Sequence, residues 1–305
     1  MTGKHAFTGQ IGRRQALHGG VAAALLWWAE RAQAAPAQRP PAEPSKSAPA
    51  PGPPRPGDPP DKENASGITI KPEDPSIVAG MVEYPGVVGT LLGYLAAPKA
   101  ADTYPGVLVL HDIVGLTEHF MDVTRRFAKA GLIAMAPDLA SRAGGTAKLG
   151  DPAKVLAALQ ANGPTQVLQD LNTAVRYLQV QPLVAKMRIG AVAFGTGGNV
   201  LWLVLAGNHD VRAAVTVSGV IPTDRIVASI SAAILSIYGE NDRRDGDAIN
   251  DFDTAMKKAG LPFIVKVEPK AGHDFFNDTT PRYVAAAAKD AWGMTLDWFA
   301  KHLSS

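Results

Sequence analysis

Residues able to act in catalysis follow the ends of predicted buried strands. His111 and Asp112 come directly after the apolar run PGVLVL, Asp242 follows SIYG, and His273 follows VEPKAG. A histidine can take a proton from a nucleophile or a water, and a carboxylate can fix the histidine tautomer and stabilise the imidazolium. Singly, a loop histidine is usually solvated and an aspartate in GENDRRD is usually a turn or helix cap. Together, at these strand ends, they predict acid–base machinery.

The stretch IGAVAFGTGG predicts a buried strand that enters a tight glycine-rich turn before a helix. This turn, Asp242 and His273 occur in the chain order of an α/β-hydrolase triad, in which the turn carries the nucleophile. The turn needs small residues two positions before and two positions after the nucleophile. Ala193 and Gly197 meet that need around Gly195, which therefore stands where a serine or cysteine is expected. Glycine suits a positive φ but supplies no nucleophile.

Three other groups could act as the nucleophile. Thr196 is one residue further on, but it would place Phe194 at a position that requires a small side chain. Ser218, in TVSG, follows the next strand without such a turn. A water activated by His273 and Asp242 could enter the space that a side chain at the turn would fill.

Strands and helices alternate from about residue 68 onward. The run TEHFMDVTRRFAKAG has the apolar spacing of an amphipathic helix and ends in a glycine cap. Further helices are expected near 166–177, from 197, near 248–258 and over 283–303. Strands are expected in MVEYPGVVGTLLGYLAAP, PGVLVL, LIAMA, RIGAVAF, RAAVTVS, AAILSIYG and FIVKVEP. This order predicts an α/β fold with a mainly parallel central sheet and helices on both faces, and ligands bind beyond the carboxyl ends of such strands.

Several of these motifs resemble the dienelactone hydrolase family, also called carboxymethylenebutenolidases. The similar stretches are HDIVGLTEHFMDVTRRFAKAGLIAMAPDLASR, YGEND, AGHDFFNDTTPRY and AWGMTLDWFAKHL, and the likeness extends from about Met81 to Leu303. The resemblance implies a single α/β-hydrolase domain, a Cys-His-Asp triad, no metal or cofactor, and hydrolysis of small lactones or esters. His273 then takes the family's histidine role and Asp242 its acid role, whereas Gly195 replaces the cysteine.

The resemblance also implies residues that bind substrate. Asp112 falls where the family often has a glutamate that interacts with the resting nucleophile, and its side chain is shorter. Arg142, after PDLAS, matches an arginine that helps to hold the substrate carboxylate, although a plain surface role is the alternative. The backbone N–H groups of Ile113 and Thr196 match the oxyanion hole.

The first 34 residues predict an export signal. An apolar run over 21–28 follows Arg13 and Arg14, and Ala32-Gln33-Ala34 offers a small-x-small cleavage site. The run is too short to span a bilayer. The arginine pair resembles a twin-arginine signal, with an ordinary secretory signal or an uncleaved amphipathic start as alternatives. The mature protein is therefore expected in the periplasm or outside the cell, without a membrane span.

Composition limits the remaining function classes. Residues 35–67 are rich in proline and alanine, so we expect an extended linker that does not pack, followed by one hydrolase-like domain over 68–305. Loss of residues 1–34 removes four basic residues and one acidic residue, which changes the formal net charge from +2 to −1. Nothing in this balance favours nucleic acid as a partner. The chain has no cysteine, which excludes disulfides and thiolate metal sites.

The sequence leaves three functional hypotheses. The first is an exported hydrolase of small esters or lactones whose covalent step is lost or replaced. The second is a pseudo-enzyme that keeps the pocket to bind a small anionic ligand such as a carboxylate, and the third is a domain tethered to the envelope or to a partner by the proline-rich segment. The retained acid and base favour residual chemistry, whereas Gly195 favours binding.

If the twin-arginine hypothesis is right, replacement of Arg13 and Arg14 by lysine will leave the protein in the cytoplasm without affecting its folding. Cell fractionation and immunoblotting of both versions measure this. Continued export of the lysine version would point to the general secretory route.

Overall fold

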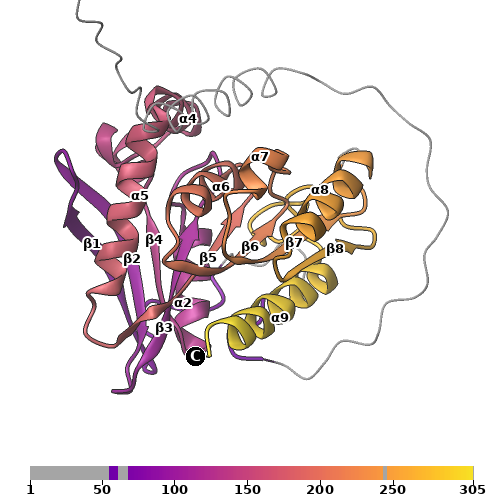
Figure 1. Ribbon diagram of the computed structural model, residues 1–305. Helices are drawn as coiled ribbons and strands as arrows, with labels where there is room; N and C mark the ends of the chain where they lie inside the picture. Colours follow the sequence, from indigo (N-terminus) through magenta and orange to yellow (C-terminus); the bar gives the residue numbers. More distant parts are fainter. Residues whose placement is uncertain (1–54, 61–67, 243–245, 305) are drawn as a thin grey trace, which may run out of the picture. The chain divides into compact units, whose positions relative to one another are not determined.

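The computed structural model describes residues 55–60, 68–242 and 246–304. Residues 1–34, the expected export signal, lie outside these ranges. The described part forms one eight-stranded sheet in the order β1-β2-β4-β3-β5-β6-β7-β8 (Figure 1). The elements are β1 (Ile77–Pro85), β2 (Thr90–Pro98), β3 (Tyr104–Leu110), α2 (Glu118–Lys129), β4 (Ile133–Pro137), the 3₁₀ turn η1 (Ser141–Ala143), α3 (Thr146–Leu149), α4 (Pro152–Ala161), α5 (Pro164–Gln179), β5 (Val184–Phe194), α6 (Gly197–Gly207), β6 (Val211–Val217), α7 (Asp224–Val227), β7 (Ala233–Gly239), α8 (Gly246–Ala259), β8 (Phe263–Glu268) and α9 (Ala285–His302).

The sheet is parallel from β4 to β8, whereas β1 and β2 form an antiparallel hairpin that pairs with β4. The apolar runs predicted as buried strands form its centre, because strands covered by helices on both faces must be apolar on both faces. This confirms the predicted α/β fold. Consecutive crossovers bring the carboxyl ends of β3, β5, β6, β7 and β8 to one edge of the sheet.

Side chains that alternate along the central strands form two cores. Val107 and Val109 of β3 pack in the core that contains α2 and α9. Leu108 and Leu110 pack in the core that contains α5, α6 and α8. Helices therefore cover both faces of the sheet (Figure 1). Within the described ranges, no helix is both long and apolar enough to cross a membrane.

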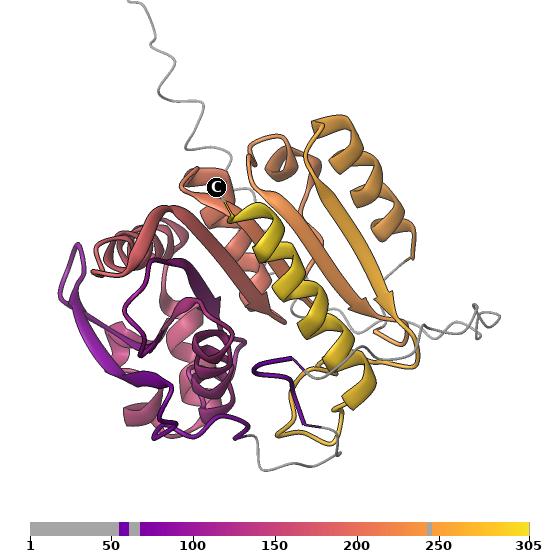
Figure 2. The same cartoon turned by 90° about the horizontal axis from the view of Figure 1, so that it is seen from below.

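Residues 55–60 pack against the domain, beside α9 (indigo beside yellow in Figure 2). The Arg55 guanidinium forms an ion pair of 2.6 Å with Asp297, and the indole N–H of Trp292 donates to the carbonyl oxygen of Pro56 at 3.3 Å. The expectation that the whole segment 35–67 cannot pack is therefore wrong for these six residues. They are held by a guanidinium and by backbone carbonyl groups, which the scarcity of large apolar side chains does not exclude.

Gly57 provides a test of this contact. Its φ is +77°, and a Cβ there would lie 2.7 Å from the carbonyl oxygen of Arg126 in α2. Gly89 has a similar φ of +74°, but a Cβ there would meet no atom within 4 Å. We expect Gly89→Ala to lower the free energy of unfolding by about 1 kcal/mol, the conformational penalty alone. Gly57→Ala adds a steric clash and should cost at least about twice as much.

Urea denaturation of both variants and of the unmodified protein measures this difference. Equal losses for the two alanine variants would show that residues 55–60 do not pack on α2.

Candidate active site

The turn between β5 and α6 holds Gly195 in the left-handed region, with φ of +51°. Its N–H donates to the carbonyl oxygen of Val217 at 3.0 Å, and its own carbonyl accepts from Gly198 at 3.1 Å. A Cβ at Gly197 would lie 2.6 Å from the carbonyl oxygen of His111. The strand-to-helix turn therefore requires the small residue that the sequence has two positions after Gly195.

The carboxylate of Asp112 lies against this turn. Its Oδ1 accepts three hydrogen bonds: from the N–H of Ile113 at 2.7 Å, from the N–H of Thr196 at 3.0 Å and from the hydroxyl of Thr196 at 2.5 Å. A Cβ at Gly195 would lie 2.5 Å from Oδ2 and 2.6 Å from Cγ of Asp112. The two N–H groups expected to form an oxyanion hole thus converge on a carboxylate of the protein itself.

This arrangement also bears on Thr196 as a nucleophile. Its hydroxyl donates to the Asp112 carboxylate at 2.5 Å, so Asp112 is the group placed to accept its proton. Thr196 therefore helps to hold the Asp112 carboxylate against the turn.

His273 and Asp242 come together from two different strand ends. Nδ1 of His273 lies 3.2 Å from Oδ2 of Asp242, which follows β7, while His273 follows β8. Because a carboxylate can only accept, the hydrogen bond assigns the proton to Nδ1, and Nε2 is then the basic nitrogen of the ring. The Asp242 side chain is buried, whereas that of His273 is 45% exposed.

A pocket joins His273 to the turn. Gly195 and His273 both line it, and its walls include Phe120, Phe194 and Phe276. Ser218 also lines the pocket, with an unusual φ of +52° at the end of β6. The pocket therefore brings together a base, a glycine turn and an aromatic wall.

Arg142 lies outside this pocket. Its guanidinium makes two hydrogen bonds of 2.8 Å to the carboxylate of Asp170 in α5. It does not line the pocket that holds Gly195 and His273. A bidentate pair of this kind already satisfies the guanidinium face that would otherwise hold a substrate carboxylate.

His111 supports the loop that carries Asp112. The N–H of Leu139 donates to Nε2 of His111 at 3.1 Å, so Nδ1 carries the proton and donates to the carbonyl oxygen of Asp112 at 2.7 Å. Burial lowers the pKa of His111, and the nearby acceptors only partly oppose this. His111 is therefore a neutral positioning residue that links the loops after β3 and β4.

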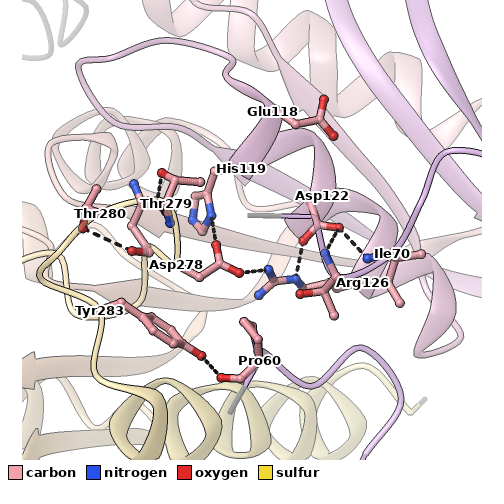
Figure 3. A network of polar contacts seen from close by, with 12 residues as sticks. Pro60, Ile70, Glu118, His119, Asp122, Arg126, Asp278, Thr279, Thr280 and Tyr283 are labelled. Atoms are coloured by element: carbon pink, nitrogen blue, oxygen red, sulfur yellow. Dashed lines mark hydrogen bonds and ion pairs between the residues drawn. The ribbon is translucent and has the colours of Figure 1, made fainter. Parts of the chain in front are cut away.

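His119 lines the pocket and belongs to a buried polar network (Figure 3). Sequence reasoning missed this network. Nδ1 of His119 lies 2.9 Å from Asp278, whose other oxygen accepts from Arg126 at 2.5 Å. Arg126 also donates to Asp122 at 2.6 Å. His119, Asp122 and Arg126 are spaced by three and four residues on α2, so they share one face of the helix. This spacing could have predicted the network from the sequence.

The network joins segments that are distant in the sequence. Asp122 accepts from the backbone N–H of Ile70 at 2.7 Å (Figure 3). In a separate contact, the Tyr283 hydroxyl donates to the carbonyl oxygen of Pro60. Burial alone would raise the pKa of Asp278, but the hydrogen bond to His119 and the charge of Arg126 outweigh it and lower the pKa. Asp278 is therefore a buried anion with its partners in place.

No group of three or more histidine, cysteine or acidic side chains is arranged to hold a metal ion in the part of the chain that the structure describes.

The sheet, the strand-to-helix turn and the histidine–carboxylate pair at its carboxyl edge define an α/β-hydrolase fold. The dienelactone hydrolase family model matches residues 91–303. A "Putative carboxymethylenebutenolidase" of Methylorubrum extorquens is 32% identical over 250 residues, covering 78% of this chain and 86% of that protein. A protein of the same name from Escherichia coli K12 is 33% identical over 251 residues, covering 78% and 92%.

A solved structure agrees with these sequences. The crystal structure titled "Putative Dienelactone Hydrolase" from Klebsiella pneumoniae has a TM-score of 0.68 and 29% identity, and the match covers 74% of this chain and 99% of that one. The chain belongs to the dienelactone hydrolase family.

The lowered pKa of His111 predicts a pH dependence of stability. In the unfolded chain His111 has a pKa of about 6.5. Below this pH the unfolded chain binds a proton on His111 that the folded protein, with its lower pKa, does not yet bind. Stability should therefore fall as the pH drops from 7.5 to 5.5, by up to about 1.4 kcal/mol per pH unit below the unfolded pKa. His111→Gln should remove this component.

Urea denaturation at the two pH values compares the unmodified protein, His111→Gln and the control His209→Gln, which replaces an exposed histidine. The prediction fails if His111→Gln shows the same loss on acidification as the unmodified protein.

Proposed function

We propose that this chain is an exported hydrolase of small esters or lactones in which His273 and Asp242 supply the base. The observation that carries the proposal is the 3.2 Å contact between these side chains beside a pocket that Gly195 also lines. Membership of the dienelactone hydrolase family supports hydrolytic chemistry, and the names of the relatives suggest a butenolide-type lactone. The sequence features of residues 1–34 support export.

The base would act on water. Nε2 of His273 takes a proton from a water above Gly195, and the resulting hydroxide attacks the substrate carbonyl. The oxyanion that forms needs the N–H groups of Ile113 and Thr196, which the Asp112 carboxylate holds in this structure. The Asp112 side chain must therefore swing out before an ester can be hydrolysed, which makes the reaction slow. Loss of a triad nucleophile typically removes about 10⁶ of the rate.

The second candidate is a pseudo-enzyme that binds a small ligand without turning it over. The filled pair of N–H donors favours this alternative, because a carboxylate in that position competes with any substrate oxygen. Arg142, which was expected to hold a ligand carboxylate, is already paired with Asp170. This weakens the case for an anionic ligand.

Removal of the competing carboxylate tests the proposal. Asp112→Ala should raise p-nitrophenol release from p-nitrophenyl acetate by at least about tenfold, because it frees both N–H donors and one such donor is worth roughly 10²-fold or more. Adding Gly195→Cys to Asp112→Ala should raise the rate by about a further hundredfold. Gly195→Cys alone should gain much less, since its Cβ would lie 2.5 Å from Asp112.

Initial rates are compared with His273→Ala, which should abolish each gain, and with Asp102→Ala, which removes an exposed carboxylate. If neither Asp112→Ala nor the double variant exceeds the unmodified protein, and all match His273→Ala, ester hydrolysis is not the function of this pocket.

A further inference from the structure

The Asp112 carboxylate is held by only one of its two oxygens. Within the described part of the chain, the hydrogen bonds to this carboxylate all end on Oδ1, from Ile113 and Thr196. Oδ2 accepts none of them and lies 2.5 Å from the position of a Cβ at Gly195. A nucleophilic sulfur or oxygen of residue 195 would be bonded to that Cβ, so Oδ2 lies in the space of the missing nucleophile. The Asp112 side chain is half-buried, not enclosed.

We propose that Asp112 is itself a nucleophile, and that Oδ2 attacks the sp³ carbon of short alkyl halides. This activity goes beyond ester hydrolysis, because a carbon–halogen bond is broken and the acyl group that forms belongs to the protein. It uses the same base, His273, and takes place beside Gly195, which lines the pocket and against which Oδ2 lies.

The position of Oδ1 selects this electrophile over a carbonyl compound. Attack on an ester carbonyl would create an oxyanion on the substrate, and the N–H groups of Ile113 and Thr196 that would stabilise it are already bound to Oδ1. Displacement at an sp³ carbon creates no such oxyanion. A halide leaves with its bonding electron pair and needs no proton from the protein. The rings of Phe120, Phe194 and Phe276 form an apolar part of the pocket wall that also contains Gly195.

In the first step a lone pair of Oδ2 forms a bond to carbon while the carbon–halogen bond breaks and halide departs. The product is an alkyl ester of Asp112. Its carbonyl oxygen is Oδ1, which already receives the hydrogen bonds of the expected oxyanion hole.

In the second step Nε2 of His273 takes a proton from water, and the hydroxide adds to Cγ of Asp112. The electron pair of the C=O bond moves to Oδ1, where the N–H groups of Ile113 and Thr196 stabilise the charge. The electron pair on Oδ1 then re-forms the C=O bond, and the Cγ–Oδ2 bond breaks. The departing alkoxide takes the proton from His273. Asp112 is regenerated as a carboxylic acid that contains one oxygen from water, and it loses its proton to solvent.

Bromoethane with the full chain tests this proposal. We expect bromide release, measured by ion chromatography, to fall by about a hundredfold in Asp112→Asn, which keeps an acceptor for the N–H groups but lacks the nucleophile. Asp102→Asn, the matched change of an exposed carboxylate, should leave the release unchanged. In His273→Ala the ester should accumulate as one ethyl group, located on Asp112 by peptide mass spectrometry.

A single turnover in H₂¹⁸O identifies the attacking oxygen. The label should enter Asp112 and be absent from the first ethanol formed. Absence of bromide release and of any ethyl adduct, an unchanged rate in Asp112→Asn, or label in the first ethanol would each overturn the proposal. The ester assay is independent, because removal of Asp112 is expected to raise ester hydrolysis and to abolish halide release.

Discussion

The turn between β5 and α6 has room for a side chain at position 195 or for the carboxylate of Asp112, but not for both. A Cβ at Gly195 would lie within 3 Å of all three carboxylate atoms. Gly195 therefore has a structural consequence besides the absence of a nucleophile. It allows the Asp112 carboxylate, from the end of the neighbouring strand, to reach the N–H groups of Ile113 and Thr196. The reaction that this site can catalyse depends on whether Asp112 or a substrate atom occupies the space beside Gly195. A substrate oxygen must compete with Asp112, whereas an electrophilic carbon can meet it.

The rest of the site is held by buried polar contacts. Arg126 donates to Asp122 and Asp278, all three side chains are buried, and Asp278 also contacts His119 at the pocket wall. Removal of one partner from such a network costs about 3–5 kcal/mol, because an uncompensated charge remains buried. The network therefore fixes α2 against the loop that follows His273, so the base and the aromatic wall keep their positions.

The sequence predicted the fold and the approach of His273 to Asp242, because buried parallel strands are recognisable as apolar runs and their carboxyl ends share one edge. It did not predict α4, although Asp151 caps this helix and Pro152 begins it. Contacts of single side chains were harder to anticipate. The pairing of Arg142 with Asp170 and the turn of Asp112 toward Gly195 depend on side-chain conformations that periodicity does not encode. The packing of residues 55–60 was missed because it uses the Arg55 guanidinium and backbone carbonyl groups instead of large apolar side chains.

The most direct test of the central claim is the amide proton shifts of Ile113 and Thr196 by NMR in the full chain and in Asp112→Ala. A hydrogen bond to a carboxylate is short and strong, and it moves an amide proton downfield. If Asp112 occupies this site, both amide protons should move upfield together in the variant, whereas the amide of Gly198, which donates to the carbonyl oxygen of Gly195, should change little. Unchanged shifts for Ile113 and Thr196 would contradict the account.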